Sequence, residues 1–242
     1  MQQFEEDGYD EDEVEVELSI LRLQGGYLKQ LLGQHEAANQ MYLSCIKSNP
    51  DDITQVAMAS NNILVLNRDR DVFDSKKRVK ALSDSALAKL TNAQRHVVHF
   101  NLALFALTLG QTAQARELIG RLQQEEGQGG GLAALAEVAL LCRQGQHSQG
   151  VELLSRFVQE RPIAAGPLVV LTLAQLQSTH KHSSQTAVQT LAAFPKVRGW
   201  AWSVGVCSQG RGQGVWLAGV VRTSICMIMG SVRSGGVVRQ GA

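Results

Sequence analysis

Apolar residues recur every three or four positions along most of the chain between residues 18 and 195. That spacing places them on one face of an α-helix. The clearest run is AKLTNAQRHVVHFNLALFALTLG, in which Val97, Phe100, Leu104 and Leu107 predict a broad buried face. Glycines, prolines and short polar stretches separate this run from its neighbours. The pattern therefore predicts an all-α fold made of packed helices.

Three segments share one template: a glycine, a small residue five positions on, a large apolar residue four later, and a proline or glycine eight further. The first glycine suits a helix end in the left-handed conformation. The small residue lets two helices approach closely, and the large one fills their interface. The final proline or glycine stops the second helix. The copies are Gly33, Ala38, Tyr42, Pro50; Gly110, Ala115, Ile119, Gly127; and Gly145, Gly150, Leu154, Pro162.

The second and third copies are offset by 35 residues, close to the roughly 34-residue period of tetratricopeptide (TPR) repeats. The first and second copies are offset by 77 residues, so a stretched, irregular unit at residues 51–91 separates them. Beyond Pro162, the small-then-large spacing of Ala187 and Leu191 predicts one more helix pair. We therefore expect a TPR-like helical-hairpin solenoid over residues 18–195.

The two ends of the chain differ from this middle region. Residues 1–17 hold nine acidic residues and few apolar ones, which predicts a disordered segment that is either a solvated linker or a ligand for a basic partner. Residues 196–242 hold 10 glycines and no acidic residue, and we expect this Gly/Val/Arg-rich tail to be unfolded. The run Lys196–Val197–Arg198 fits translation through a donor splice site (AAG-GTG-AGG), so we interpret the tail as intron read-through.

Composition narrows the functional classes. The net charge of +1 indicates neither a nucleic-acid nor a membrane partner, and no apolar run of about 18 residues predicts a membrane span. The four cysteines form no CxxC pair, as expected of reduced thiols in a cytoplasmic protein. The chain has no GxxxxGK[ST], HExxH or GxSxG motif. We therefore expect no enzyme activity, no cofactor and no metal site.

The irregular unit carries the candidate contact residues. DITQVAMASNNILVLN predicts a helix that includes Asn61 and Asn62, and Asp74 or Ser75 is a candidate cap for the helix that follows. A compact basic run then suits contacts with RNA phosphates, although a solvated helix face is the favoured interpretation. The sequence predicts no aromatic platform for base stacking beside this run. The basic residues are Lys76, Lys77, Arg78 and Lys80.

The stretch ASNNILVLNRDRDVFDSKKRVK (59–80) resembles the atypical repeat of the seventy-two-kilodalton subunit family of the signal recognition particle. HFNLALFALTLGQTAQA, LCRQGQHSQGVELLSRF and LTLAQL continue the resemblance in the same order, over about residues 18–194. The resemblance implies an α-helical repeat protein of the cytosolic ribonucleoprotein that targets nascent secretory chains to the endoplasmic reticulum. It implies that the TPR region holds the sixty-eight-kilodalton partner subunit.

In that family, a separate lysine-rich C-terminal segment binds the particle's RNA. The present sequence begins within the repeat array and leaves the family pattern at Pro195, so we expect a partial form that keeps the scaffold role. Two alternatives stay open at this point. One is RNA binding through the basic run and the basic tail. The other is a TPR co-chaperone or adaptor, for which Arg22, Asn61 and Asn62 are the sparse candidate groove residues.

Overall fold

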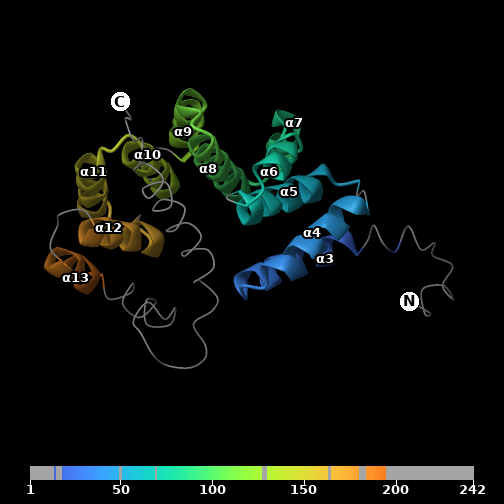
Figure 1. The fold of residues 1–242 in the computed structure, drawn as a ribbon, viewed down its shortest axis with the longest axis horizontal. Coiled ribbons are helices and arrows are strands. Elements are labelled where there is room, and N and C mark those ends of the chain that lie inside the picture. The colour runs from blue at the N-terminus through green and yellow to red at the C-terminus, as the bar shows by residue number, and fades with distance from the viewer. Residues whose placement is uncertain are drawn as a thin grey trace, which may run out of the picture. The chain divides into compact units, whose positions relative to one another are not determined.

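The computed structural model describes residues 14, 18–48, 51–68, 70–126, 130–162, 165–179 and 184–194. These residues form eleven helices, α3 to α13, and no strand (Figure 1). The predicted all-α fold is therefore confirmed. The predictions for the acidic segment and for the tail at 196–242 fall outside the described residues, apart from Val14.

The chain divides into two compact units, residues 1–101 and 102–242. In the first unit, α3 packs on α4, α4 packs on α5, and α3 also touches α5. The long helix α5 contacts both short helices that follow it, α6 and α7. The helices of this unit are α3 (Ser19–Leu31), α4 (His35–Lys47), α5 (Ile53–Asn67), α6 (Val72–Val79), α7 (Asp84–Lys89) and the first part of α8 (Asn92–Thr108).

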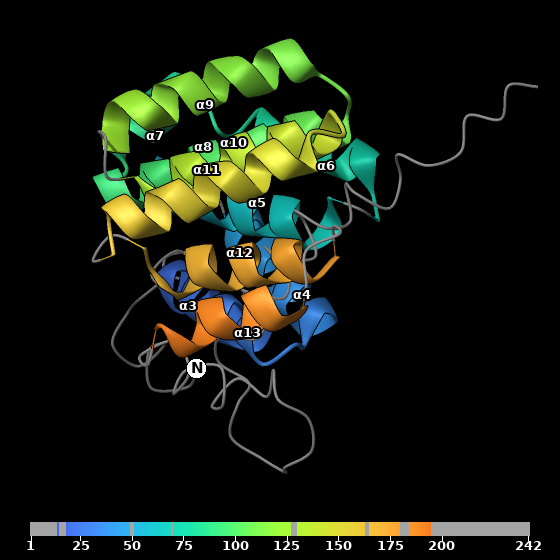
Figure 2. The ribbon, with the colours of Figure 1, turned by 90° about the vertical axis from the view of Figure 1, so that its left-hand side faces the viewer.

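In the second unit, each helix packs on the next one along the chain, from α9 to α13. The helix α12 also contacts α10, so the pair α12–α13 lies beside the pair α10–α11 (Figure 2). This arrangement of successive hairpins is the one that the repeat template predicts. The helices are α9 (Thr112–Glu126), α10 (Gly131–Arg143), α11 (His147–Glu160), α12 (Pro167–Thr179) and α13 (Ser184–Ala192).

The three template glycines close three equivalent turns. Gly33, Gly110 and Gly145 have φ angles of 75°, 73° and 77°, the left-handed region that favours glycine. In each turn, the N–H of the residue directly after the glycine donates to a carbonyl five residues earlier; for Gly145 this is Gln146 N to Leu141 O, at 2.9 Å. This is the Schellman motif, which satisfies carbonyls that a helix end leaves unpaired.

The next two template positions are buried in every copy. Ala38 and Tyr42 are 0% exposed, and the equivalent pairs at 115/119 and 150/154 are also buried. The last template position is less informative, because Pro50 and Gly127 lie outside the described residues. Pro162 is exposed and follows the end of α11 by two residues.

Helix α3 runs without interruption through Gly25 and Gly26, although paired glycines weaken helices by about 0.5–1 kcal/mol each. The neighbouring helix explains their presence. A Cβ on Gly26 would lie 2.7 Å from Cε1 of Tyr42, and one on Gly25 would lie 2.5 Å from Cε of Met41. The glycines therefore let α4 pack directly against the backbone of α3.

The helix starts of the first unit differ in part from the sequence prediction. The cap of α6 is Asp71, whose Oδ1 accepts from the N–H of Asp74 at 2.9 Å, so the prediction of Asp74 or Ser75 as the cap is wrong. The prediction of a buried Val97 is also wrong: this side chain is 41% exposed, and the adjacent Val98 takes the buried position. Both errors are shifts of one to four residues along helices that the sequence locates correctly.

We predict opposite effects for two glycine-to-alanine substitutions in the second unit. Gly145→Ala should lower the free energy of unfolding by about 1–2 kcal/mol, because a Cβ there meets no neighbour but strains the left-handed backbone. Gly120→Ala in the middle of α9 also meets no neighbour and should raise stability by about 0.5–1 kcal/mol. Urea denaturation measures both. Equal effects of the two substitutions would contradict the assignment of the turn.

Candidate partner-binding surface

Asn61 lies in the core of the first unit. It is 2% exposed, and its Oδ1 accepts a hydrogen bond of 2.9 Å from Nδ2 of Asn101 on α8. Its own Nδ2 donates to Oδ1 of the adjacent Asn62 at 3.1 Å. A buried amide is stable only when such partners satisfy it, because an unpaired one keeps its full desolvation cost.

The same hydrogen-bonded chain continues to α3 and α4. Tyr42 is fully buried, and its phenol donates to Oε1 of Gln30 at 2.8 Å. Burial raises the pKa of the Tyr42 phenol well above its ordinary value of 10.0, although a side-chain hydrogen bond with Asn62 acts in the opposite direction. We call this set of side chains the polar chain: Gln30, Tyr42, Asn62, Asn61 and Asn101.

The polar chain changes the interpretation of the two asparagines. The sequence predicts that Asn61 and Asn62 are candidate partner contacts. In the structure, the Asn61 amide is buried and hydrogen-bonded to Asn101 and Asn62. Asn62 is half-buried and shares this network. The groove of a carboxylate-capturing co-chaperone would need these amides to be presented on the surface, so the structure does not support that alternative.

Helix α6 is linked to α5 by a hydrogen bond. Oδ2 of Asp74 accepts from Nδ2 of Asn67 at the end of α5, at 3.3 Å. Within α6, Nη2 of Arg78 lies 3.0 Å from Oδ1 of the same carboxylate, one helical turn earlier, and both side chains are largely covered. Arg78 therefore pairs with the carboxylate that binds Asn67, and Lys76, Lys77 and Lys80 are exposed.

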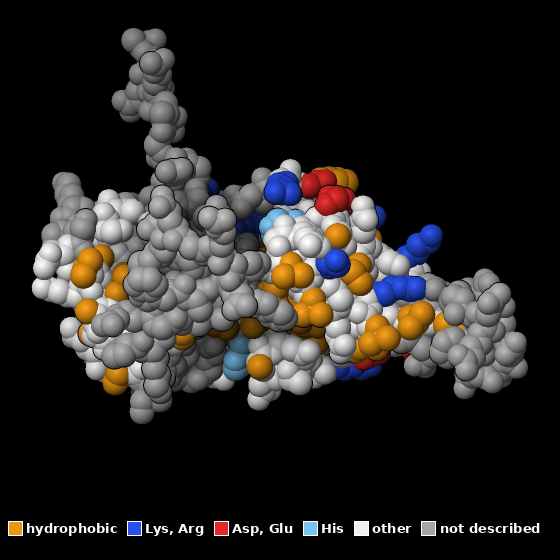
Figure 3. Space-filling model, turned by 90° about the horizontal axis from the view of Figure 1, so that it is seen from below, with side chains coloured by type: hydrophobic (Ala, Val, Ile, Leu, Met, Phe, Trp, Pro, Cys, Tyr) orange, Lys and Arg blue, Asp and Glu red, His pale blue; other side chains and the backbone are white. Residues whose placement is uncertain are grey.

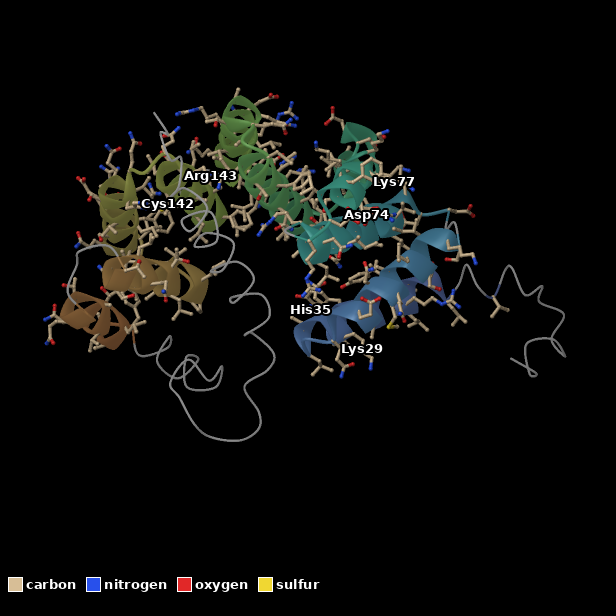
Figure 4. All side chains as sticks on the ribbon, viewed as in Figure 1. Lys29, His35, Asp74, Lys77, Cys142 and Arg143 are labelled. Carbon is tan, nitrogen blue, oxygen red and sulfur yellow. The ribbon has the colours of Figure 1, made fainter. Side chains whose placement is uncertain are left out.

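Lys76, Lys77 and Lys80 are exposed, and Phe73 is 84% exposed beside them. Positions three, four and seven apart share one face of a helix, so these four residues form one surface, which we call the α6 face. Figure 4 labels Lys77 and Asp74 on this helix. The sequence predicts no aromatic platform for base stacking beside the basic run, and Phe73 adds a single exposed aromatic side chain there. The motif VFDSKK contained the signal, but Phe73 reads as a core residue when only hydrophobicity is considered.

A second exposed surface lies on α3. Five large apolar residues cover one face of this helix and are 42–57% exposed. Viewed from below, hydrophobic side chains gather where α3 and α4 lie in Figure 1 (Figure 3). Apolar surface of this kind marks sites of protein–protein contact. The residues of this apolar α3 face are Ile20, Leu21, Tyr27, Leu28 and Leu32.

The second unit holds a pocket of about 420 Å³ between α9, α10 and α11. Its lining combines Glu137 and Glu160 with Arg156 and Arg161, and the Arg161 guanidinium lies 5.5 Å from the centre of the Phe157 ring. Oppositely charged groups of this kind neutralise one another.

Among the described residues, His, Cys, Asp and Glu form no group of three or more that is able to hold a metal ion. No helix in the described part of the chain is both long and apolar enough to span a membrane.

The repeat template, the Schellman turns and the stacked hairpins define an α-helical repeat protein of the TPR type. No protein-family profile matches the chain, but individual relatives do. It is 37% identical over 183 residues to the human signal recognition particle subunit SRP72, an alignment that covers 75% of this chain and 27% of that protein. It is 30% identical over 161 residues to SRP72 of Caenorhabditis elegans, covering 66% of this chain and 25% of the relative.

A third relative, SRP72 of Schistosoma mansoni, is 38% identical over 117 residues, covering 48% of this chain and 16% of the relative. This chain is an SRP72-like protein. It spans about a quarter of the length of the curated relatives it matches.

We predict that the hydrogen bond between Asn61 and Asn101 contributes to stability as a pair. Asn101→Ala should cost about 1–3 kcal/mol, because it leaves the buried Oδ1 of Asn61 without its donor. The double variant Asn61→Ala/Asn101→Ala should cost clearly less than the sum of the two single variants. Urea denaturation of all four chains completes the cycle. Additive costs would show that the two amides act independently.

We predict a stability loss at alkaline pH that depends on Tyr42. Its pKa is raised in the folded state, so the fold favours the neutral phenol; this stabilisation is complete below pH 10 and is lost as the pH rises beyond it. Tyr42→Phe should therefore show a flatter decline in unfolding free energy between about pH 9 and pH 11. The matched control is Tyr27→Phe, which removes a phenol that is 45% exposed. The same flattening in both variants would contradict the role of burial.

Proposed function

We propose that this chain is a non-enzymatic interaction scaffold of the signal recognition particle. In this role it acts in the cytoplasm, needs no cofactor, and helps to target nascent secretory proteins to the endoplasmic reticulum. The observation that carries the proposal is the 183-residue match to SRP72, a protein named as a subunit of that particle. The stacked hairpins support it, because such repeats offer continuous surfaces for peptide or helix binding.

The proposed partner is the sixty-eight-kilodalton subunit of the particle, bound through the repeats. The apolar α3 face is the surface that suits it best, because its five exposed side chains offer the desolvated core that protein interfaces require. Helix α3 is also rigidly held, since Tyr42 packs on Gly26 and donates to Gln30 of that helix. A pre-organised surface lowers the cost of ordering side chains on binding.

Direct binding of the particle's RNA is the weaker candidate. Arg78 is committed to Asp74, which leaves three exposed lysines on the α6 face. Three phosphate contacts with single-stranded RNA would give a salt dependence with a slope of only about −2 in log K against log salt concentration. Such binding would be weak at physiological ionic strength.

A capture experiment tests the proposal. The full chain, immobilised, should retain the sixty-eight-kilodalton subunit, and Leu21→Ser should weaken the affinity about tenfold by removing a central apolar contact. The matched control is Val188→Ser on α13, because Val188 is 60% exposed and Leu21 is 57% exposed. The particle RNA is offered separately as a second ligand.

Failure of the full chain to retain the partner subunit would refute the proposed function. Equal losses with Leu21→Ser and Val188→Ser would keep the scaffold role but would remove the apolar α3 face as its site.

A further inference from the structure

The α6 face combines an aromatic side chain with positive charge on a single helical surface. Phe73 is 84% exposed, far more than any other large apolar residue that the structure describes, and the three lysines lie one or two helical turns from it. Leaving a phenylalanine in water is unfavourable, so a ligand that covers the ring gains apolar contact as well as charge pairing. The face therefore suits an anionic ligand that also carries an apolar or aromatic group.

The chain itself contains a segment with that chemistry. Residues 5–13 read EEDGYDEDE and hold seven acidic side chains, and Phe4 and Tyr9 supply aromatic rings. The whole chain has only 22 acidic residues, so nearly a third of its negative charge is concentrated in nine positions. These positions lie outside the residues that the structure describes.

We propose that the acidic residues 5–13 bind to the α6 face of the same chain. In this contact, the carboxylates pair with Lys76, Lys77 and Lys80, and an aromatic ring of the segment covers Phe73. The contact goes beyond the proposed scaffold role and does not depend on it.

The packing of the first unit places the α6 face within reach of the acidic residues 5–13. Val14 accepts a backbone hydrogen bond from Leu18 at 2.9 Å, so the acidic residues begin directly before the first turn of α3. The Oγ of Ser19 at the start of α3 donates to Oε1 of Gln55 in the first turn of α5. Helix α5 in turn packs on α6.

The acidic segment is long enough to reach from the start of α3 to α6. Two helix-to-helix steps of about 8–10 Å each separate α3 from α6 across α5, and thirteen extended residues span up to about 43 Å. The segment therefore reaches the α6 face with residues to spare. Tethering of this length gives an effective concentration of about 1 mM, which fills a weak site without tight intrinsic affinity.

The local charge favours a short acidic peptide over a nucleic acid. Residues 71–89, which include α6 and α7, carry five basic and three acidic side chains. A long polyanion such as RNA that runs along α6 would meet the carboxylate of Asp71, which caps the start of this helix, whereas a short peptide contacts the lysines beyond it. Like-charge contacts of this kind are costly and oppose binding of a long anionic strand.

Zero-length carbodiimide cross-linking of the full chain tests the contact directly. It joins carboxylates to amines that already touch, so the peptides 5–13 should be found linked to Lys76, Lys77 and Lys80 in the monomeric fraction. Lys29 and Lys47 are exposed lysines on α3 and α4 and serve as internal controls. Links spread evenly over all five lysines, or absent from α6, would overturn the proposal.

Lysine acetylation gives a second, independent measurement. A variant in which the seven acidic residues at 5–13 become Gln or Asn should show acetylation at Lys77 about threefold faster than the natural chain, as expected when a site about two-thirds occupied becomes free. The rate at Lys29 should not change. Phe73→Ser in the natural chain should raise the Lys77 rate in the same direction, because it removes the apolar part of the contact.

An unchanged acetylation rate at Lys77 in the neutralised variant would refute the proposal. If a single-stranded RNA oligomer then protected the same lysines from acetylation, the α6 face would be identified as a nucleic-acid site.

Discussion

The first unit depends on the need to satisfy buried amides. Asn61 and Asn101 lie where solvent cannot reach them, so each requires the other at a fixed distance and orientation. Hydrophobic packing alone tolerates small slips between helices, whereas a hydrogen bond of 2.9 Å does not. The polar chain passes through α3, α4, α5 and α8, and it therefore sets the alignment of four helices in a stack otherwise held by non-directional contacts.

The same buried hydrogen bonds determine which side chains of the irregular unit, residues 51–91, face the interior. Helix α5 must present Asn61 to α8 and Tyr42 must reach Gln30, so these positions are committed to the interior. The two short helices α6 and α7 follow α5, and Asp74 of α6 accepts a hydrogen bond from Asn67 at the end of α5. As a result, the side chains of this unit divide clearly into an internal network and an outward surface on α6.

Much of the fold was predictable because glycine conformation and helical periodicity are local properties. The turns at Gly33, Gly110 and Gly145 follow from sequence spacing, and so do the buried positions at Ala38 and Tyr42. The direction of a polar side chain is not local. Asn61 reads as a surface amide until α8 supplies its partner, and Phe73 reads as a core residue until the structure shows its side chain 84% exposed.

The apolar α3 face was also hidden in the sequence, for a related reason. Its leucines have the spacing of a buried stripe, and the sequence carries no mark that separates them from Leu31, which is 8% exposed although it lies three residues after Leu28 on the same side of the helix. The apolar α3 face thus consists of residues whose composition suggests a core, and the same is true of Phe73 on the α6 face. Exposure, which depends on which helices meet, is what distinguishes them.

The separation of Asn61 and Asn101 along the chain has a consequence for biosynthesis. The two amides are 40 positions apart, and the residues between them include all of α6 and α7. A nascent chain folds from its N-terminal side as it is made, so α3, α4 and α5 are synthesised before the donor that Asn61 uses in α8. The hydrogen bonds within α3, α4 and α5 do not depend on that donor, and the bond from Asn101 is added to them when α8 arrives.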